Sequence, residues 1–388
     1  MADPYDEMRR LMTAYAESIH VDSGLRRRIG ANVTSRRKGR TGLWLAYVAT
    51  GVITVLVVAT FVYIRQPGAP RPAGPPTFTT FTTPSRDSLP SAIVEGPDGA
   101  MWFTERGVSG IGRISQAGAV TEYPLPESNA APTSIAAGSD GALWFTAPGA
   151  NEIGRITTAG QVSEYALPTP SAEPQSIALG PDGNLWFTEL AGNKIGRIGV
   201  DGTITEFELP RRGEVQCGFV CPYGIARGLD GALWFTESQL SAGGGNRVGR
   251  LTTDGQLTEY PLPSANALPT CITAGRDLVY VCESRTSRLA EVGRTGSVTE
   301  RELPGAGAGA AAVAAVATKD GRVWIVVARQ NPGGPGGGEV AILGRDGSFT
   351  TYKAPASADV REGAAVDASG QLWFVAGSAE VMRMRLDS

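Results

Sequence analysis

Residues 176–210 read SIALGPDGNLWFTELAGNKIGRIGVDGTITEFELP, and this phrase decides the fold. It contains four short segments rich in β-branched and aromatic residues: SIALG, NLWFTE, KIGRI and TITEFELP. Turn residues such as Pro181-Asp182-Gly183 separate them. The phrase therefore predicts four short β-strands that run alternately up and down and are joined by tight turns.

The same phrase recurs along the chain. Its aromatic anchor, Trp186 here, returns in every unit at intervals of 42, 42, 48, 46, 44 and 49 residues. The anchors are Trp102, Trp144, Trp186, Trp234, Tyr280, Trp324 and Trp373. A period in the forties with four strands per unit is typical of a β-propeller blade, and anchors that recur in this way are expected to form the blade cores. We name the strands of each unit a, b, c and d in chain order.

The last unit stops at RMRLDS, before its strand d, and residues 77–83 (TFTTFTT) resemble the missing piece. Pairing this N-terminal strand with the last strand c would cover an exposed sheet edge. The sequence predicts an all-β, seven-bladed β-propeller over residues 77–388, closed by its N-terminal strand.

Residues 43–64 form an uncharged, apolar run of 22 residues, long enough for one transmembrane helix of roughly 33 Å. Residues 26–40 before it hold seven basic residues and no acidic one. The positive-inside rule then predicts a single-pass membrane protein. Residues 1–42 would form a cytoplasmic basic segment with room for a cytoplasmic partner, residues 65–76 a Pro-rich linker, and the propeller would be extracytoplasmic. The alternative is a cleaved signal peptide, for which this run is long.

Composition limits the partners and the chemistry. The chain has a net charge of −3, and residues 43–388 alone carry −7, so the predicted outer part is acidic and a nucleic-acid partner is not expected. The single histidine, His20, lies in the predicted cytoplasmic segment. Most histidine chemistry is therefore excluded from the propeller.

All four cysteines fall on the predicted outer side, where disulfides persist. Cys271 and Cys282 flank a short turn and could pair across a hairpin, while Cys217 and Cys221 could close a local loop. An alternative ties that loop to Cys271. A zinc site is disfavoured by the spacing and by the lack of an outer histidine.

Two repeated charges are predicted to be structural. The arginines of the IGR motif recur with the glutamates of the T-E-Y/F motif, which suggests one ion pair per blade. The pairs are Arg113 with Glu122, Arg155 with Glu164, Arg197 with Glu206 and Arg250 with Glu259. The aspartates before the turn glycines, such as Asp182, are predicted to be turn residues rather than metal ligands.

The phrases GPDGNLWFTELAGNKIGRI and DGTITEFELP resemble the streptogramin B lyase (virginiamycin B lyase) family of seven-bladed propellers, over about residues 77–388. The resemblance implies magnesium-assisted ring opening of a cyclic depsipeptide antibiotic by elimination, with a histidine as base or acid. Two family histidines correspond to Val313 and Glu362 here, and a metal-holding glutamate corresponds to Val360. A tyrosine in a PYGI motif occurs at Tyr223, in the fourth blade, whereas Ser91 occupies the first-blade position.

The alternating strands give the ring two faces. The a–b and c–d turns are short and uniform, and we call their side the regular face. The d–a and b–c connections are longer and variable (211–222, 238–246, 305–312 and 329–339), and their side is the irregular face. Variable loops on a rigid scaffold usually carry function. The closing strand enters from the regular side, so the irregular face is expected to point away from the membrane.

Candidate site residues follow from this layout. Tyr223, Glu237, Glu283 and Glu362 are the candidate ligand-binding residues, and Glu362 is the weak candidate for a substituted catalytic base. Glu105, Glu189, Glu237 and Glu283 end strand b, and with Glu362 they could surround the channel mouth and hold a cation; Glu283 and Glu362 are the metal candidates, for the Mg²⁺ that the resemblance allows.

Three functions remain open at this point. The first is a tethered module that binds a small molecule or an envelope component on the irregular face, without chemistry. The second is a Mg²⁺-dependent lyase with a substituted base, and the third is a transmembrane sensor. The missing histidines favour the first over the second.

Overall fold

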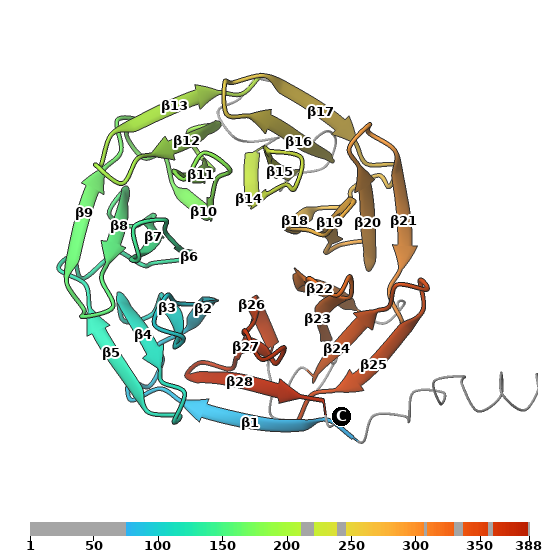
Figure 1. Ribbon diagram of the computed structural model, residues 1–388, viewed down its shortest axis with the longest axis horizontal. Coiled ribbons are helices and arrows are strands. Elements are labelled where there is room, and N and C mark those ends of the chain that lie inside the picture. The colour runs from blue at the N-terminus through green and yellow to red at the C-terminus, as the bar shows by residue number, and fades with distance from the viewer. Residues whose placement is uncertain are drawn as a thin grey trace, which may run out of the picture. The chain divides into compact units, whose positions relative to one another are not determined.

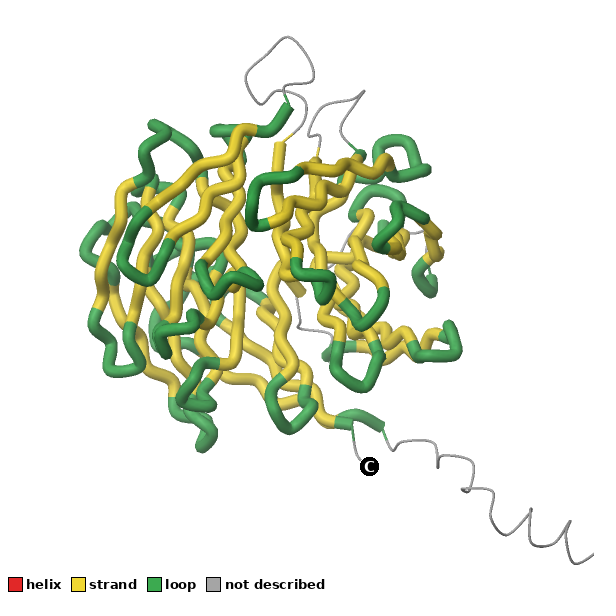
Figure 2. The backbone as a smooth tube through the Cα atoms, turned by 45° about the horizontal axis from the view of Figure 1, so that its top comes forward, coloured by secondary structure: helices red, strands yellow, loops and turns green. Residues whose placement is uncertain are grey.

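The computed structural model describes residues 75–210, 221–238, 246–305, 309–329, 337–355 and 360–386, with the backbone alone for residues 361 and 362. These residues form seven four-stranded antiparallel sheets arranged around a central channel (Figure 1). The strands run through the thickness of the ring and turn at its two faces, and the described residues form no helix (Figure 2). The predicted seven-bladed propeller is confirmed.

In each blade, strand a lies at the channel and strand d at the rim (Figure 1). The a strands are β2 (Pro90–Glu95), β6 (Ile135–Ala137), β10 (Pro174–Leu179), β14 (Cys221–Arg227), β18 (Pro269–Ala274), β22 (Ala310–Ala317) and β26 (Val360–Val366). The b strands are β3 (Met101–Glu105), β7 (Leu143–Ala147), β11 (Leu185–Glu189), β15 (Ala232–Ser238), β19 (Leu278–Glu283), β23 (Val323–Arg329) and β27 (Leu372–Ala376). The c strands are β4 (Gly110–Ile114), β8 (Glu152–Ile156), β12 (Lys194–Ile198), β16 (Arg247–Thr252), β20 (Arg288–Gly293), β24 (Gly337–Leu343) and β28 (Glu380–Arg385). The d strands are β5 (Val120–Pro124), β9 (Val162–Ala166), β13 (Ile204–Glu208), β17 (Leu257–Pro261), β21 (Val298–Glu302), β25 (Phe349–Lys353) and β1 (Thr77–Thr82).

The ring closes between the two ends of the propeller sequence. β1 pairs antiparallel with β28, from Thr77 opposite Arg385 to Thr82 opposite Glu380. The last sheet therefore has the order β1-β28-β27-β26, as the missing strand d predicts. Residues 1–42 and 43–64 lie outside the described residues, and within the described part no helix could span a membrane.

Strand b forms the core of each blade. The anchors Trp102, Trp144, Trp186 and Trp234 are buried, as is the phenylalanine that follows each of them. In blade 1 that phenylalanine, Phe103, covers Gly112 of the IGR motif; a Cβ on Gly112 would stand 2.0 Å from the ring. The glycine is therefore required by close packing of strands b and c.

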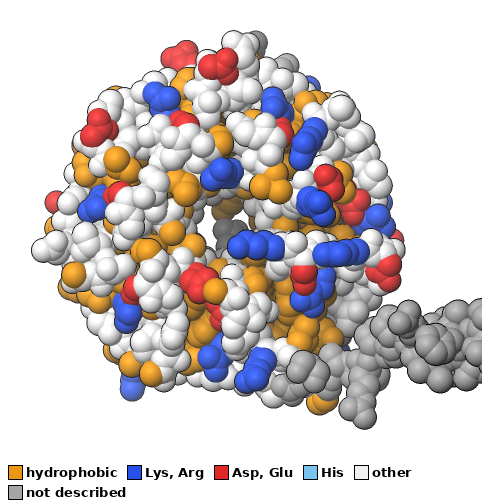
Figure 3. Space-filling view, in the orientation of Figure 1, with side chains coloured by type: hydrophobic (Ala, Val, Ile, Leu, Met, Phe, Trp, Pro, Cys, Tyr) orange, Lys and Arg blue, Asp and Glu red, His pale blue; other side chains and the backbone are white. Residues whose placement is uncertain are grey.

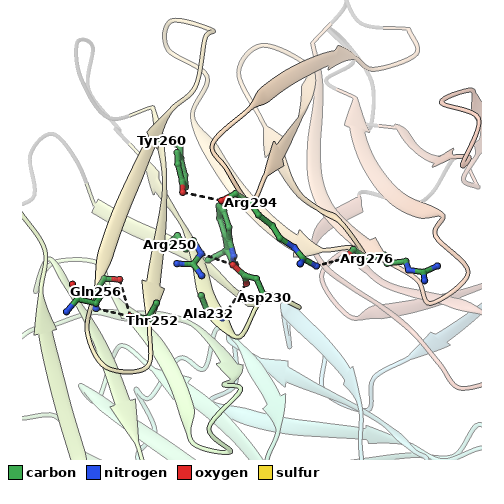
Figure 4. Close-up of polar contacts among 9 residues, drawn as sticks. Asp230, Ala232, Arg250, Thr252, Gln256, Tyr260, Arg276 and Arg294 are labelled. Carbon is green, nitrogen blue, oxygen red and sulfur yellow. Dashed lines mark hydrogen bonds and ion pairs between the residues drawn. The ribbon is translucent and has the colours of Figure 1, made fainter.

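The repeated arginines have a partner that the sequence did not predict. Each pairs with the aspartate of the a–b turn, which also accepts a hydrogen bond from the anchor tryptophan. In blade 4, Arg250 Nε lies 2.6 Å from Asp230 Oδ2, and Trp234 Nε1 donates to Asp230 Oδ1 at 3.1 Å (Figure 4). We call this unit the Asp–Trp–Arg latch; the others are Asp98–Trp102–Arg113, Asp140–Trp144–Arg155 and Asp182–Trp186–Arg197.

The expected arginine–glutamate pairs are therefore wrong. Arg113 stands opposite Thr121, whereas Glu122 stands opposite Gly112, so the two side chains point to opposite faces of the blade. Glu122 instead accepts hydrogen bonds from the backbone N–H (2.8 Å) and Oγ (2.7 Å) of Ser85, in the loop before the blade. Glu206 and Glu300 do the same for Thr169 and Ser264.

One of the expected disulfides is confirmed. Cys271 of β18 is bonded to Cys282 of β19, with their Cα atoms 5.1 Å apart. Cys221 is buried at the start of β14. Cys217 lies outside the described residues, and its pairing stays a prediction.

Candidate functional site

The central channel is the candidate site, because the a strands direct side chains into it. In six of the blades the register between strands a and b shifts near the irregular end, for example between Pro222 and Ile225 of β14. The shift is a β-bulge, which re-aims the residues within it. The bulge residues and their neighbours line a cavity of about 260 Å³.

Threonines fix the bulges of blades 1 to 4. In blade 3, Thr188 Oγ1 accepts a hydrogen bond from the Ser176 N–H (3.1 Å) and donates to the Tyr223 carbonyl of the next blade (2.7 Å). Thr104, Thr146 and Thr236 make the same two bonds in their own blades. The buried hydroxyls thus hold neighbouring a strands together and set the channel wall. We call these four residues the threonine belt.

Blades 5 to 7 have no threonine at this position. Cys282, Val326 and Val375 follow the anchor at the same spacing, and all three are buried. In blade 5 the Cys271–Cys282 disulfide links strands a and b where the threonine links them elsewhere. The hydrogen bond to the next blade, which the threonine makes in blades 1 to 4, is made in blade 5 by Ser284, whose Oγ donates to the Ala312 carbonyl at 2.9 Å.

Polar and small apolar groups share the channel wall. The lining residues include Arg106, hydroxyl and amide side chains, and a set of isoleucines and small residues from the a strands. They are Ser91, Ala92, Ile93, Thr133, Ser134, Ile135, Gln175, Ser176, Tyr223, Gly224, Ile225, Thr270, Cys271, Ile272, Val313, Ala314, Ala315, Gly363 and Ala364. The wall is suited to a ligand with both apolar surface and hydrogen-bonding groups.

The structure brings three of the family positions to this wall and leaves one away from it. Ser91, Tyr223 and Val313 line the cavity. Val360 is buried in the core shared by blades 6 and 7. The backbone of Glu362 lies in β26, next to the lining residue Gly363, and its side chain lies outside what the structure describes.

The glutamates that end strand b do not belong to the described channel wall. Glu237 and Glu283 are buried within blades 4 and 5, and neither lines the cavity with Tyr223. Burial raises the pKa of Glu283 to about 7, with a further contribution from the Glu300 carboxylate. Thr286 Oγ1 donates to the Glu283 carboxylate at 2.6 Å.

Glu105 and Glu189 occupy the same position at the end of strand b in blades 1 and 3, and their pKa values are raised more than that of Glu283. Burial, followed by repulsion from Glu122, raises the pKa of Glu105 to about 8; burial and Glu206 have the same effect on the pKa of Glu189, in spite of Lys194 nearby. Among the described residues neither carboxyl makes a hydrogen bond of ordinary geometry, although Ser88 and the Glu122 carboxyl lie near Glu105. Both are therefore mostly protonated at neutral pH and act as buried neutral groups.

The described residues do not fit a magnesium centre in the channel. Mg²⁺ binds through carboxylate oxygens, and the described lining side chains include no carboxylate. Within the described ranges, no group of three or more His, Cys, Asp or Glu side chains is arranged to hold a metal ion.

Sequence reasoning missed the threonine belt, although its signal was present: threonine follows Trp-Phe in each of the first four units. Most of the long connections of the irregular face, 211–220, 239–245, 306–308 and 330–336, lie outside the described residues. Their role in binding stays a prediction.

The protein is a seven-bladed β-propeller, and side chains from all seven blades line a cavity in its central channel that is the candidate binding site. The sequence matches the Virginiamycin B lyase family over residues 71–218 and 214–387. The chain belongs to this family.

Individual relatives agree with this assignment. Over 60 residues the chain is 40% identical to a virginiamycin B lyase from Nocardia farcinica, a match that spans 16% of this chain and 22% of that relative. A solved streptogramin B lyase is 32% identical, with a TM-score of 0.71, over 80% of this chain and 98% of that one. A catalytically inactive variant of virginiamycin B lyase from Staphylococcus aureus with quinupristin is also 32% identical, with a TM-score of 0.69, over 80% and 99% of the two chains.

Proposed function

We propose that this protein is a membrane-tethered, extracytoplasmic member of the family that binds a small molecule or an envelope component through its channel and irregular face, without ordinary streptogramin lyase activity. One observation carries the proposal. Val313 lies in the channel wall where the family has a histidine, and the described lining residues supply hydroxyl, amide and apolar groups.

Chemistry by elimination needs a base whose pKa lies near the working pH. Among the described lining side chains, Tyr223 and Arg106 are the ionisable ones apart from the disulfide-bonded Cys271. Neither is an imidazole or a carboxylate, the side chains that most often act as general bases. Binding therefore suits these residues better than proton abstraction.

The test of this proposal uses quinupristin, which a solved relative holds. The full chain is incubated with quinupristin and Mg²⁺, beside the Staphylococcus aureus enzyme as positive control, and products are read by mass spectrometry. We expect intact quinupristin with this chain and ring-opened product with the control. Mg²⁺-dependent product that disappears in Glu362→Gln, with the fold intact, would establish the alternative of a lyase with a substituted base.

Ligand binding has its own matched variants. A ligand found by screening should bind more weakly to Tyr223→Ala, because Tyr223 lines the channel at the bulge of β14. The control is Asp182→Asn, a change in an a–b turn of the regular face that removes no channel group. Equal weakening in both variants would place the ligand elsewhere.

The tether is supported by the apolar run 43–64 and the basic residues before it. Protease added to intact cells should remove the propeller and spare the first 42 residues. Full-length protein that is protected in intact cells and cleaved after lysis would reverse the orientation. A cytoplasmic partner captured with residues 1–42 would add a sensing role.

A further inference from the structure

Blades 5 and 6 enclose a hollow on the regular face that the channel does not explain. Its volume is about 460 Å³, larger than the channel cavity. Three turns line it: 275–278 in blade 5, 318–322 in blade 6 and 343–347 at the c–d turn of blade 6. Figure 3 looks onto this face and shows Lys and Arg side chains gathered around this side of the channel, over blades 5 and 6.

The hollow lies where both blades lack the strand c arginine of the latch. In blade 6 Arg322, from the a–b turn, lies over the Trp324 ring instead, 5.7 Å from its centroid. In blades 1 to 4 the strand c arginine lies over the anchor ring and fills this corner, as Arg250 does with Trp234 at 6.0 Å. The residue opposite the anchor is Glu291 in blade 5 and Ile342 in blade 6. Blade 5 also has Tyr280 in place of tryptophan, and this ring lines the hollow.

Five cationic side chains line the space: Arg276, Arg301, Lys319, Arg322 and Arg345. Two of them are neutralised by acids. Arg301 Nε lies 2.5 Å from Glu291 Oε1, and Arg322 Nη2 lies 2.7 Å from Asp320 Oδ2. These two arginine side chains are still 39% and 41% exposed.

The other three cations come from three different turns. Arg276, Lys319 and Arg345 are exposed, and within the described part of the chain none of them forms an ion pair. Arg294 donates to the backbone carbonyl of Arg276 at 3.2 Å, while the Arg276 guanidinium points away from the blade 4 latch (Figure 4). Arg345 Nε, from the c–d turn of blade 6, donates to the Asp320 carbonyl of the a–b turn, and this bond holds the Arg345 side chain against the neighbouring turn.

The acidic residues at the hollow do not cancel this charge. Glu291 is paired with Arg301, as above. Asp346 accepts hydrogen bonds from the N–H and Oγ of Ser348, within its own turn. Asp277 is the remaining acidic lining residue. Together with Asp320, the partner of Arg322, four acids stand against five cations, an excess of one positive charge.

We propose that this hollow binds a phosphate group. Guanidinium groups offer paired N–H donors that match phosphate oxygens, and an ammonium adds a point charge. Converging cations from separate turns, around a space that the fold leaves unfilled, give such a group several donors at once. Phosphate binding here is independent of the channel ligand, and only the lipid source of the phosphate, described next, rests on the proposed membrane tether.

The phosphate could belong to a free phosphate compound or to a phospholipid headgroup. The chain enters the ring at Thr77, opposite Arg385, at the c–d corner of the regular face. With residues 43–64 anchored as predicted, the bilayer is the nearest supply of phosphate to this face. The experiment below separates the two sources.

The full chain is held in a non-ionic detergent that contains no phosphate and titrated with inorganic phosphate by isothermal calorimetry. We expect saturable binding that weakens at least tenfold in Arg276→Gln with Lys319→Gln. The matched control, Arg227→Gln with Lys353→Gln, removes two exposed cations outside the hollow and should change the Kd less than twofold. Absence of saturable binding, or equal weakening in the control, would overturn the proposal.

A second titration uses nanodiscs that contain phosphatidylglycerol. If the headgroup occupies the hollow, it competes, and the apparent Kd for phosphate rises in these discs for the wild type but not for the double variant. An unchanged Kd assigns the hollow to a soluble phosphate compound. Melting curves of the variants confirm that these exposed turn substitutions leave the fold intact.

Discussion

Blades 1 to 4 and blades 5 to 7 share one architecture but differ in what holds it together. The first four each have an Asp–Trp–Arg latch on the regular face and a member of the threonine belt toward the irregular face. The last three replace the belt by a disulfide or by valines, and blades 5 and 6 lose the strand c arginine. The difference teaches that repeated contacts maintain the scaffold, and that new surfaces arise where a repeat is broken.

Removing the closing strand should have the largest effect, because it takes a whole strand from the sheet of blade 7 and opens the ring. A chain that lacks residues 75–84 loses every β1–β28 backbone hydrogen bond, each worth about 0.5–1.5 kcal/mol net, and exposes the edge of β28. We expect aggregation, or a melting temperature lowered by more than ten degrees, by calorimetry. A melting curve like that of the full chain would show that the ring is stable without the β1–β28 pairing.

Removing an anchor side chain should destabilise blades 1 to 4 more than blade 5. Trp186→Ala empties a fully buried site and should lower the free energy of unfolding by about 3–5 kcal/mol. Tyr280→Ala should cost clearly less, because the Tyr280 ring is only partly buried and borders the hollow of blades 5 and 6. Urea unfolding of the two variants measures the difference, and equal losses would contradict the comparison.

The buried glutamates of blades 1 and 3 predict how stability depends on pH. In the folded protein the pKa of each carboxyl is raised to about 8, far above the ordinary value of a glutamate near 4.5. The folded state then binds more protons than the unfolded state between these values, so stability is highest at the acidic end and falls as pH rises through 8. The melting temperature should drop by several degrees between pH 5 and pH 9.

Substituting one of these groups should flatten that profile. Glu189→Gln keeps the shape and removes the titration, whereas Glu208→Gln, on an exposed residue at the end of the same blade's β13, should leave the slope unchanged. A wild-type melting temperature that rises with pH over this range would contradict the prediction.

The threonine belt predicts the smallest effect. Thr188→Val removes both hydrogen bonds and leaves the Ser176 N–H and the Tyr223 carbonyl without that partner. The expected loss is about 1–3 kcal/mol. Thr258→Val, at an exposed site on β17, should stay within about 0.5 kcal/mol. Similar losses for both variants would show that the belt has no special role.

Much of the fold was predictable because each blade repeats a local pattern. The Trp spacing gave seven blades, the missing last strand indicated closure by residues 77–83, and the turn between Cys271 and Cys282 indicated their disulfide. The arginine partners were not predictable from recurrence alone. Arg113 and Glu122 recur together, but one step of strand register decides which face each side chain occupies.

The site was less accessible to sequence reasoning than the fold. Tyr223, which a motif marked, lines the channel cavity, and its role in binding stays a prediction. Glu237 and Glu283 were expected at the channel mouth and lie buried within their blades. A carboxyl at a strand end can point into the channel or into the blade, and the sequence pattern does not distinguish these two orientations. The hollow of blades 5 and 6 depends on Tyr280, Glu291 and Ile342 together, and no single motif reports it.

The pairing of β1 with β28 also sets an order of events during synthesis. Residues 77–82 are made first, and their partner, residues 380–385, leaves the ribosome about 300 residues later. At about 5–20 residues per second this interval lasts roughly 15–60 s. During this interval the segment TFTTFT has no strand to pair with. Its four threonines make it more hydrophilic than an all-aliphatic strand would be. The strand that closes the ring is thus the first strand of the propeller to be translated. Until residues 380–385 are made, it must avoid pairing with strands of other chains.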